Sequence, residues 1–336
     1  MNTGHLLGKV QWEKVVEGMI RAYTLYAPVN LWGHVDYARI GPDNINQIVY
    51  NHPRPVTPLK TFLLPVKQNL RHTADHKRTI VMGIPSCDLQ ALDLLDAIYL
   101  DGKLPDPVYR QRRENTILIG SDCHHTLETC HCMAYGIRPG PQKNHDILLN
   151  TSGEHLYLAP VTEKGKEVLD KILSGVETSV PDDGLLNELD ALLDKIAAEV
   201  TERNKHLPDY STTGKIIRES DAEIWKKYAG HCVSCGACAA GCPTCSCFQL
   251  IDRPGFEKIR NVDTCQYPGF ERVAAGEDPL KPLADRFRNR YMCKYVWKPA
   301  RYNAVACTGC GRCIDACIGR INKNELIVEL MDKVTA

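Results

Sequence analysis

The sequence predicts an α/β N-terminal domain followed by a mainly α-helical C-terminal domain rich in cysteine. Short apolar runs at residues 79–84 and 116–120 have the length of buried strands, and residues 87–100 between them have helical periodicity. Strand, helix and strand in this order indicate a parallel sheet covered by helices. The prediction for the second domain depends on the spacing of the cysteines between residues 232 and 317.

The other elements of the N-terminal part are predicted from periodicity and turn residues. Apolar side chains recur at helical spacing over residues 11–26, which predicts an amphipathic helix. Prolines are frequent in residues 30–75 and indicate irregular structure, with an edge strand at residues 61–64. Ser86 precedes the helix at residues 87–100 and is its expected N-cap.

Further elements are expected along the rest of the chain. Strands are predicted at residues 146–149 and 156–160, and helices at residues 165–173, 185–207 and 280–291. The helix at residues 185–207 has a heptad-like apolar stripe, so we expect it to pack between the two domains.

Two cysteine runs with the same spacing lie near the C-terminus. Each has the spacing C-x₂-C-x₂-C-x₃-C, and the thiols are Cys232, Cys235, Cys238 and Cys242 in the first run and Cys307, Cys310, Cys313 and Cys317 in the second. This spacing holds an iron–sulfur cubane, because three thiols on a short loop can reach three corners of one cluster. Two runs therefore predict two 4Fe-4S clusters, which together form a path for single electrons.

In proteins with two such clusters, the fourth cysteine of each run usually ligates the other cluster. This rule assigns Cys232, Cys235, Cys238 and Cys317 to cluster 1, and Cys307, Cys310, Cys313 and Cys242 to cluster 2. The long insert at residues 243–306 contains helix patterns. We therefore expect a mainly α-helical dicluster ferredoxin-like domain rather than a compact ferredoxin built on β-hairpins.

Zinc and disulfides are the alternatives for so many cysteines. Zinc usually takes two separated pairs of thiols, which fits evenly spaced triplets poorly. Disulfides are typical of small secreted domains, whereas residues 1–11 lack the apolar core of a signal peptide. The expected setting is a reducing, anaerobic cytoplasm.

Length and charge set further limits. The chain has 336 residues with 41 basic and 41 acidic side chains, and no run approaches the ~20 apolar residues of a membrane span. We expect an α/β domain at residues 1–175, a helical linker at 176–222 and the dicluster domain at 223–336. The basic stretch at residues 281–301 has no nucleic-acid fold signature. It is interpreted as charge compensation beside the clusters, with a docking face as the alternative.

Eight cysteines lie outside the two runs. Four of them follow predicted strands at the same edge of the sheet and are candidate ligands of a third iron–sulfur cluster: Cys87, Cys123, Cys130 and Cys132. The alternatives are that these are buried apolar residues, or that His125 or His131 replaces one thiolate. The sequence gives no ranking of roles for the last four: Cys245, Cys247, Cys265 and Cys293.

The same residues resemble a known family. The pattern C-x-x-C-G-x-C-x-x-x-C-P-T-C-x-C-F at residues 232–248, together with residues 83–89, 112–116 and 129–132, resembles the iron–sulfur subunit of anaerobic sulfite reductase and the β subunit of cytoplasmic sulfhydrogenases. Most members have Arg-Pro where this chain has Pro85 and Ser86. The resemblance implies a carrier of electrons between two subunits, a flavoprotein that oxidises NAD(P)H and a catalytic subunit. That catalytic subunit is a sulfite reductase, a hydrogenase or a heterodisulfide reductase-like module.

The leading hypothesis is thus a non-catalytic electron relay. The chain has no G-x-G-x-x-G pattern after a predicted strand, so a nicotinamide or flavin pocket is not expected. The first alternative is an iron–sulfur enzyme that reduces a disulfide or sulfur compound near Cys245 and Cys247. The second is a zinc-stabilised interaction module.

Overall fold

The computed structural model describes residues 4–71 and 78–335, and its N-terminal part is built on a seven-stranded sheet. The strand order is β1-β8-β7-β6-β5-β2-β3. The bounds are β1 (His5–Gly8), β2 (Thr24–Leu31), β3 (His34–Arg39), β5 (Thr79–Ile84), β6 (Thr116–Gly120), β7 (Ile147–Ser152) and β8 (His155–Pro160). The four central strands, β2, β5, β6 and β7, are parallel, and the outer strands pair antiparallel.

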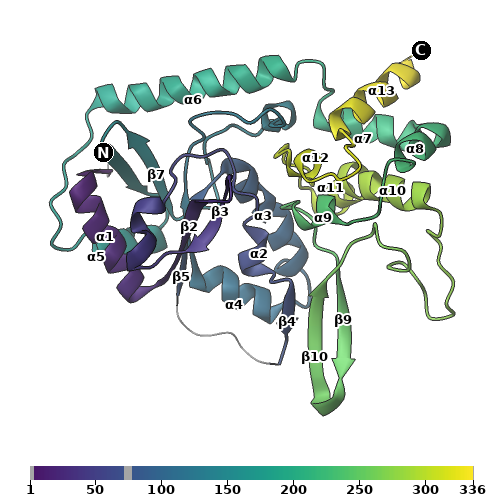
Figure 1. Ribbon diagram of the computed structural model, residues 1–336, viewed down its shortest axis with the longest axis horizontal. Coiled ribbons are helices and arrows are strands. Elements are labelled where there is room, and N and C mark those ends of the chain that lie inside the picture. The colour runs from purple at the N-terminus through teal and green to yellow at the C-terminus, as the bar shows by residue number, and fades with distance from the viewer. Residues whose placement is uncertain (1–3, 72–77, 336) are drawn as a thin grey trace.

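Helices cover both faces of this sheet (Figure 1). α1 (Lys9–Ala22) and α5 (Glu163–Ile172) share one apolar core with alternate residues of the central strands, among them Ile80 and Met82 of β5. α2 (Lys60–Leu63), α3 (Ser86–Tyr99) and α4 (Pro107–Asn115) share a second core with the residues between these, such as Val81. Burial of both faces agrees with the nearly continuous apolar runs of β5 and β6.

Most predicted elements of this part are present, with three differences. The strand predicted at residues 61–64 is wrong, because Leu59 and Leu63 are buried on the sheet from the short helix α2. The first helix ends at Ala22 rather than residue 26, since Tyr23 is already extended and β2 begins at Thr24. Ser86 is the first residue of α3 and not its N-cap. The segment at residues 30–75, predicted as irregular, contains strand β3, helix α2 and a further short strand at Lys67–Asn69, and its last residues lie outside the described residues.

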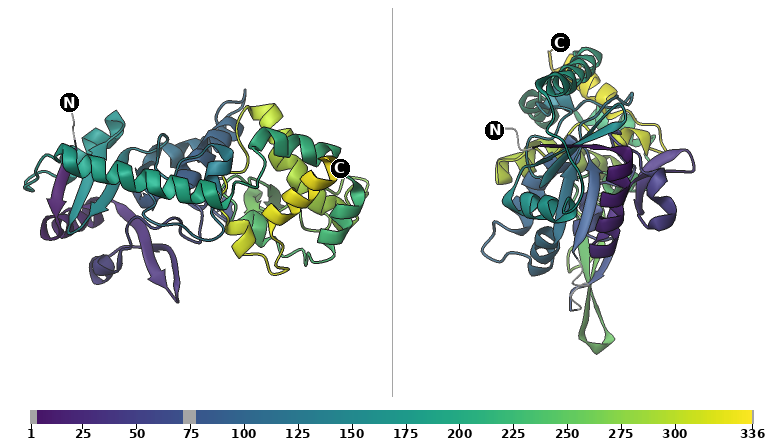
Figure 2. Two further views of the ribbon diagram at one scale, coloured as in Figure 1. Left: turned by 90° about the horizontal axis from the view of Figure 1, so that it is seen from above. Right: turned by 90° about the vertical axis from the view of Figure 1, so that its left-hand side faces the viewer.

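The long helix α6 (Asp183–Arg203) leads from the sheet to the C-terminal part (Figures 1 and 2). Asp182 is its N-cap, and the Asp182 carboxylate accepts a hydrogen bond from the backbone N–H of Leu185 at 2.8 Å. At its other end Arg203 donates to the carbonyl of Leu127, and Asn204 donates to that of Cys130 at 2.9 Å. The C-terminus of α6 thus holds the loop that bears two of the N-terminal cysteines.

The C-terminal part is helical around its own apolar core, which includes Trp225, Tyr291 and Leu326. Its helices are α7 (Tyr210–Glu219), α8 (Ala222–Ala229), α9 (Ala237–Ala240), α10 (Leu283–Met292), α11 (Lys298–Tyr302), α12 (Arg312–Asp315) and α13 (Lys323–Thr335). A π-helical turn, Cys293–Trp297, joins α10 to α11. Such turns widen a helix locally and are frequent at functional sites.

A β-hairpin projects from this helical part (Figure 1). β9 (Phe248–Arg253) pairs with β10 (Glu257–Val262), and β10 also pairs with β4 (Lys67–Asn69) from the N-terminal part. The prediction of a mainly α-helical C-terminal domain is therefore confirmed only in part. Among the described residues no helix is both long and apolar enough to cross a membrane.

Candidate metal centres

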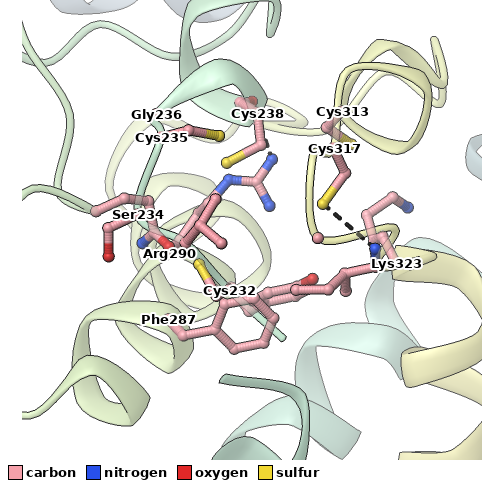
Figure 3. Close-up of a pocket in the computed structure, with 15 residues that line it drawn as sticks. Cys232, Ser234, Cys235, Gly236, Cys238, Phe287, Arg290, Cys313, Cys317 and Lys323 are labelled. Carbon is pink, nitrogen blue, oxygen red and sulfur yellow. Dashed lines mark hydrogen bonds between the residues drawn. The ribbon is translucent and has the colours of Figure 1, made fainter. Parts of the chain in front are cut away.

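The first three cysteines of the first run and the last two of the second run line one cavity (Figure 3). The first group of thiols is Cys232, Cys235, Cys238 and Cys317. Three come from the loop between α8 and the end of α9, and the fourth follows α12. The empty space is about 500 Å³, including the part open to solvent. This grouping is the one that exchange of the fourth cysteine between clusters requires.

A second cavity of about 300 Å³ lies next to the first. The second group of thiols lines it: Cys242, Cys307, Cys310 and Cys313. Cys313 lines both cavities, so the two groups are direct neighbours.

Three polar side-chain atoms of residues that line the second cavity have no hydrogen-bond partner among the described residues. They are the buried His131 Nε2, Arg290 Nε and Thr308 Oγ1. Buried polar atoms are nearly always paired, so three orphans around one space indicate that a polar group belongs there. A cluster carrying sulfide and thiolate sulfur would supply acceptors for the Arg290 and Thr308 donors. The residues present therefore fit the group.

The buried side chain of Lys294 supplies positive charge at the second cavity. The Lys294 ammonium donates to Cys242 Sγ at 2.8 Å, to Thr244 Oγ1 at 3.0 Å and to the carbonyl of Ala306 at 3.1 Å. A hydrogen bond from the Cys245 thiol, aided by the charge of Lys294, holds the pKa of Cys242 well below its usual range. The site thus favours the thiolate form that iron requires.

Other basic side chains of the stretch at residues 281–301 also point inward. Arg286 and Arg290 are buried, and Arg290 donates to the carbonyl of Cys238 at 3.1 Å. Four thiolates around one cubane core leave a net negative charge, which buried cations offset. This placement favours charge compensation as the role of this stretch.

The four N-terminal cysteines form a third group: Cys87, Cys123, Cys130 and Cys132. Cys87 lies at the start of α3 after β5, and the other three follow β6. Burial raises the pKa of the Cys123 thiol, and the nearby Cys132 and Cys130 thiolates raise it further. Burial likewise raises the pKa of Cys87, with added contributions from Asp88 and the Cys310 thiolate. The third group is therefore close to Cys310 of the second.

Tight contacts fix the third group against the second. The backbone N–H of His131 donates to the carbonyl of Gly309 at 2.9 Å. Gly309 has φ +65°, and a Cβ at this position would lie 2.6 Å from the backbone of Cys132. Glycine is thus required here both by the backbone angle and by the close approach of the two loops.

A buried ion pair joins the same two segments. The guanidinium of Arg312, from the second run, donates to the Asp88 carboxylate at 2.5 and 2.9 Å and to the carbonyl of Pro55 at 2.9 Å. The Arg312 and Asp88 side chains are 2% and 0% exposed, so neither charge has access to water. Nearby, Arg54 pairs with Asp315. These contacts hold the third group in place beside the second.

The thiols do not form a site for a single ion. Among residues 4–71 and 78–335, no three His, Cys, Asp or Glu side chains converge closely enough to hold one metal ion. A tetrahedral zinc site would bring four ligand atoms to ~2.3 Å from one point, whereas a cubane holds its thiolates apart. His125 packs against His52, and His131 faces the second cavity rather than the third group.

Sequence reasoning missed Lys60, which the structure places at the thiols. This lysine is buried in α2 and donates to the carbonyls of Ala239 and Cys245, at 2.9 and 3.0 Å. Its position between apolar residues was a weak signal of an inward-facing charge.

Comparison with known proteins agrees with this geometry. The family described as "4Fe-4S dicluster domain" matches residues 231–321, which span both cavities. The sulfhydrogenase 2 subunit beta of Pyrococcus furiosus is 28% identical over 307 residues, or 86% of this chain and 87% of that protein. The chain is thus similar to a sulfhydrogenase β subunit and contains a 4Fe-4S dicluster domain. The similarity extends over the N-terminal part as well as the dicluster domain. Both findings support an iron–sulfur electron-transfer subunit.

Proposed function

We propose that the chain relays single electrons inside a multisubunit redox complex, between a flavoprotein that oxidises NAD(P)H and a catalytic redox subunit. The catalytic subunit is a sulfite reductase, a hydrogenase or a heterodisulfide reductase-like module. The observation that carries the proposal is the contiguity of three thiol groups. Cys313 lines the cavities of both the first and second groups, and Cys310 lies beside the third.

In this proposal each thiol group holds one 4Fe-4S cluster, so cluster 1 belongs to the first group, cluster 2 to the second and cluster 3 to the third. A bound cluster takes up and releases one electron. The division into residues 1–175, 176–222 and 223–336 then assigns cluster 3 to the α/β domain and the other two to the dicluster domain.

The residues around the groups have three tasks. They hold the thiols in place, as the Arg312–Asp88 pair does between the second and third groups. They keep water from the second cavity, whose thiols Cys242 and Cys307 are buried. They also place positive charge beside the thiolates, as Lys294 does at Cys242. Burial and hydrogen bonds to sulfur are the main means by which a protein sets cluster potentials.

Iron and sulfide analysis tests the assignment of the third group. The chain and its variant Cys87→Ser/Cys123→Ser are each reconstituted with iron and sulfide under strictly anaerobic conditions, and the bound iron and sulfide are measured. The variant should hold about four iron and four sulfide fewer than the parent. An unchanged count would remove the third cluster from the proposal and leave the other two.

The relay itself is tested with partners. The complex should be isolated anaerobically from the source cells and its subunits identified. A flavoprotein and a catalytic redox subunit should co-purify, and NAD(P)H should reduce the clusters only when the flavoprotein is present. Reduction of the isolated chain by NAD(P)H alone would contradict the relay.

A further inference from the structure

Four cysteines lie outside the three groups, and the structure brings them together. They are Cys245, Cys247, Cys265 and Cys293. They come from three separate segments, namely the loop after α9, the loop after β10 and the first position of the π-helical turn. We call these thiols the fourth group.

Interactions between side chains place the four members near one another, and the backbone N–H of Asp263, two residues before Cys265, donates to the carbonyl of Cys247 at 3.0 Å. The Cys247 and Cys265 side chains are hydrogen-bonded to each other, and the backbone of Cys265 also bonds to the Cys247 sulfur. Cys265 lies within electrostatic range of Cys245, and Cys293 within range of Cys247. Cys265 is buried and the other three are half-buried. Such convergence from distant parts of the sequence is more than the packing of single small apolar side chains requires.

The surroundings of the fourth group are basic and polar. A pocket of about 300 Å³ opens onto Cys245 and Cys247, and its lining includes Lys60 and Arg260. Lys298 donates to the carbonyl of Thr244 at 2.9 Å and to Ser246 Oγ at 3.0 Å. Among the residues that the structure describes, no carboxylate lines this pocket; Arg260 pairs with Asp106 at 2.5 Å, which leaves Lys60 as the charge of the lining that no carboxylate balances. Neutral thiols need no such positive charge, whereas four thiolates around a metal cluster do.

Two local features of the chain serve this arrangement. The π-helical turn starts at Cys293 and also contains Lys294, which donates to Cys242 of the second group. Lys60 reaches from α2 to the carbonyl of Cys245 and ties the N-terminal part to the loop that bears two of the thiols.

We propose that Cys245, Cys247, Cys265 and Cys293 bind a further iron–sulfur cluster. Each thiol gives up its proton on binding, and the cluster then exchanges one electron with its neighbour without a bond being made or broken. This deepens the proposed relay and rests on it. The Cys245 side chain lies next to that of Cys242 of the second group. The second group would then lie at a branch point, in contact with the first, third and fourth groups.

The first test is the iron content of the parent chain. Reconstituted with iron and sulfide alone, the parent should bind about 16 iron and 16 sulfide, where three clusters would give about 12 of each. A stable parent count of about 12, with all three other groups shown to be loaded, overturns the proposal whatever the variants do.

Variants then locate the additional iron. Cys247→Ala/Cys293→Ala should lose about a quarter of the iron and sulfide, and a matching share of the spins in the electron paramagnetic resonance spectrum of the reduced protein. Ser246→Ala, which leaves all thiols in place, should lose none. Cys87→Ala/Cys123→Ala, which removes ligands of the third group, should also lose about a quarter of the iron and sulfide. A variant with all four substitutions should lose about half.

The competing role for these thiols is a disulfide that is reduced beside the second cluster. In that case the Cys247→Ala/Cys293→Ala variant keeps all its iron, and oxidised parent protein shows two fewer titratable thiols after unfolding. This outcome contradicts the fourth cluster. The proposed relay fails by a different result, namely the absence of iron loss in variants of the first, second and third groups.

Discussion

Replacing Lys294 by methionine tests whether its buried charge sets the reduction potential of cluster 2. The ammonium donates to Cys242 Sγ at 2.8 Å and is buried with two further acceptors, Thr244 Oγ1 and the carbonyl of Ala306. Reduction adds a negative charge to the cluster, and the ammonium stabilises that charge. Methionine fills a similar volume without the charge, so the potential should fall.

The size of the fall follows from Coulomb's law. Two unit charges about 4 Å apart interact by about 4 kcal/mol at an effective dielectric constant of about 20. The added electron is shared over the whole cluster, so we take roughly half of this value, about 2 kcal/mol. For a one-electron couple about 1.4 kcal/mol corresponds to about 59 mV. The expected fall is therefore roughly 80 mV.

A redox titration followed by electron paramagnetic resonance measures this shift. Lys227→Met is the matched control, because Lys227 is exposed and pairs with Glu329 on the protein surface. The control should leave all potentials unchanged. A Lys294→Met variant with full iron content and an unchanged or raised potential for cluster 2 would refute the electrostatic reasoning.

Two further predictions concern the contact between the second and third groups. Arg312→Met leaves the Asp88 carboxylate buried without a counter-charge and with the backbone N–H of Leu59 as its remaining donor, so the free energy of unfolding in anaerobic urea titrations should fall by about 3–5 kcal/mol. Arg113→Met removes a partly exposed ion pair and should cost less than about 1 kcal/mol; equal losses would contradict the argument. Gly309→Ala should displace the loop of the third group and lower its iron content, since its Cβ meets backbone at 2.6 Å. Gly33→Ala also has a positive φ but faces open space, so iron loss in this control would show that strain alone is responsible.

Much of the candidate site could be predicted because cysteine spacing is a local property. Three thiols on one loop must face the same small volume, and a fixed spacing therefore predicts the grouping of Cys232, Cys235 and Cys238. The place of Cys87 and Cys123 followed from sheet topology, since parallel strands end at one edge. The ligand roles of these thiols stay predictions until iron is counted.

The remaining features depend on long-range contacts that periodicity does not reveal. Residues 61–64 are apolar enough for a strand, but the second core requires Leu63 on a helix. The hairpin β9–β10 gains a third strand, β4, from a distant part of the chain. The fourth group could not be predicted either, because its members reach one another from three segments. Spacing within one segment carried no information about them.

The central claim is that this chain binds iron–sulfur clusters that accept single electrons. Electron paramagnetic resonance of the anaerobically purified protein, recorded before and after addition of dithionite, tests it most directly. We predict a brown protein whose reduced form gives the signals of several interacting 4Fe-4S clusters, with a spin count that matches its iron content. A colourless protein that gives no signal after reduction would contradict the claim.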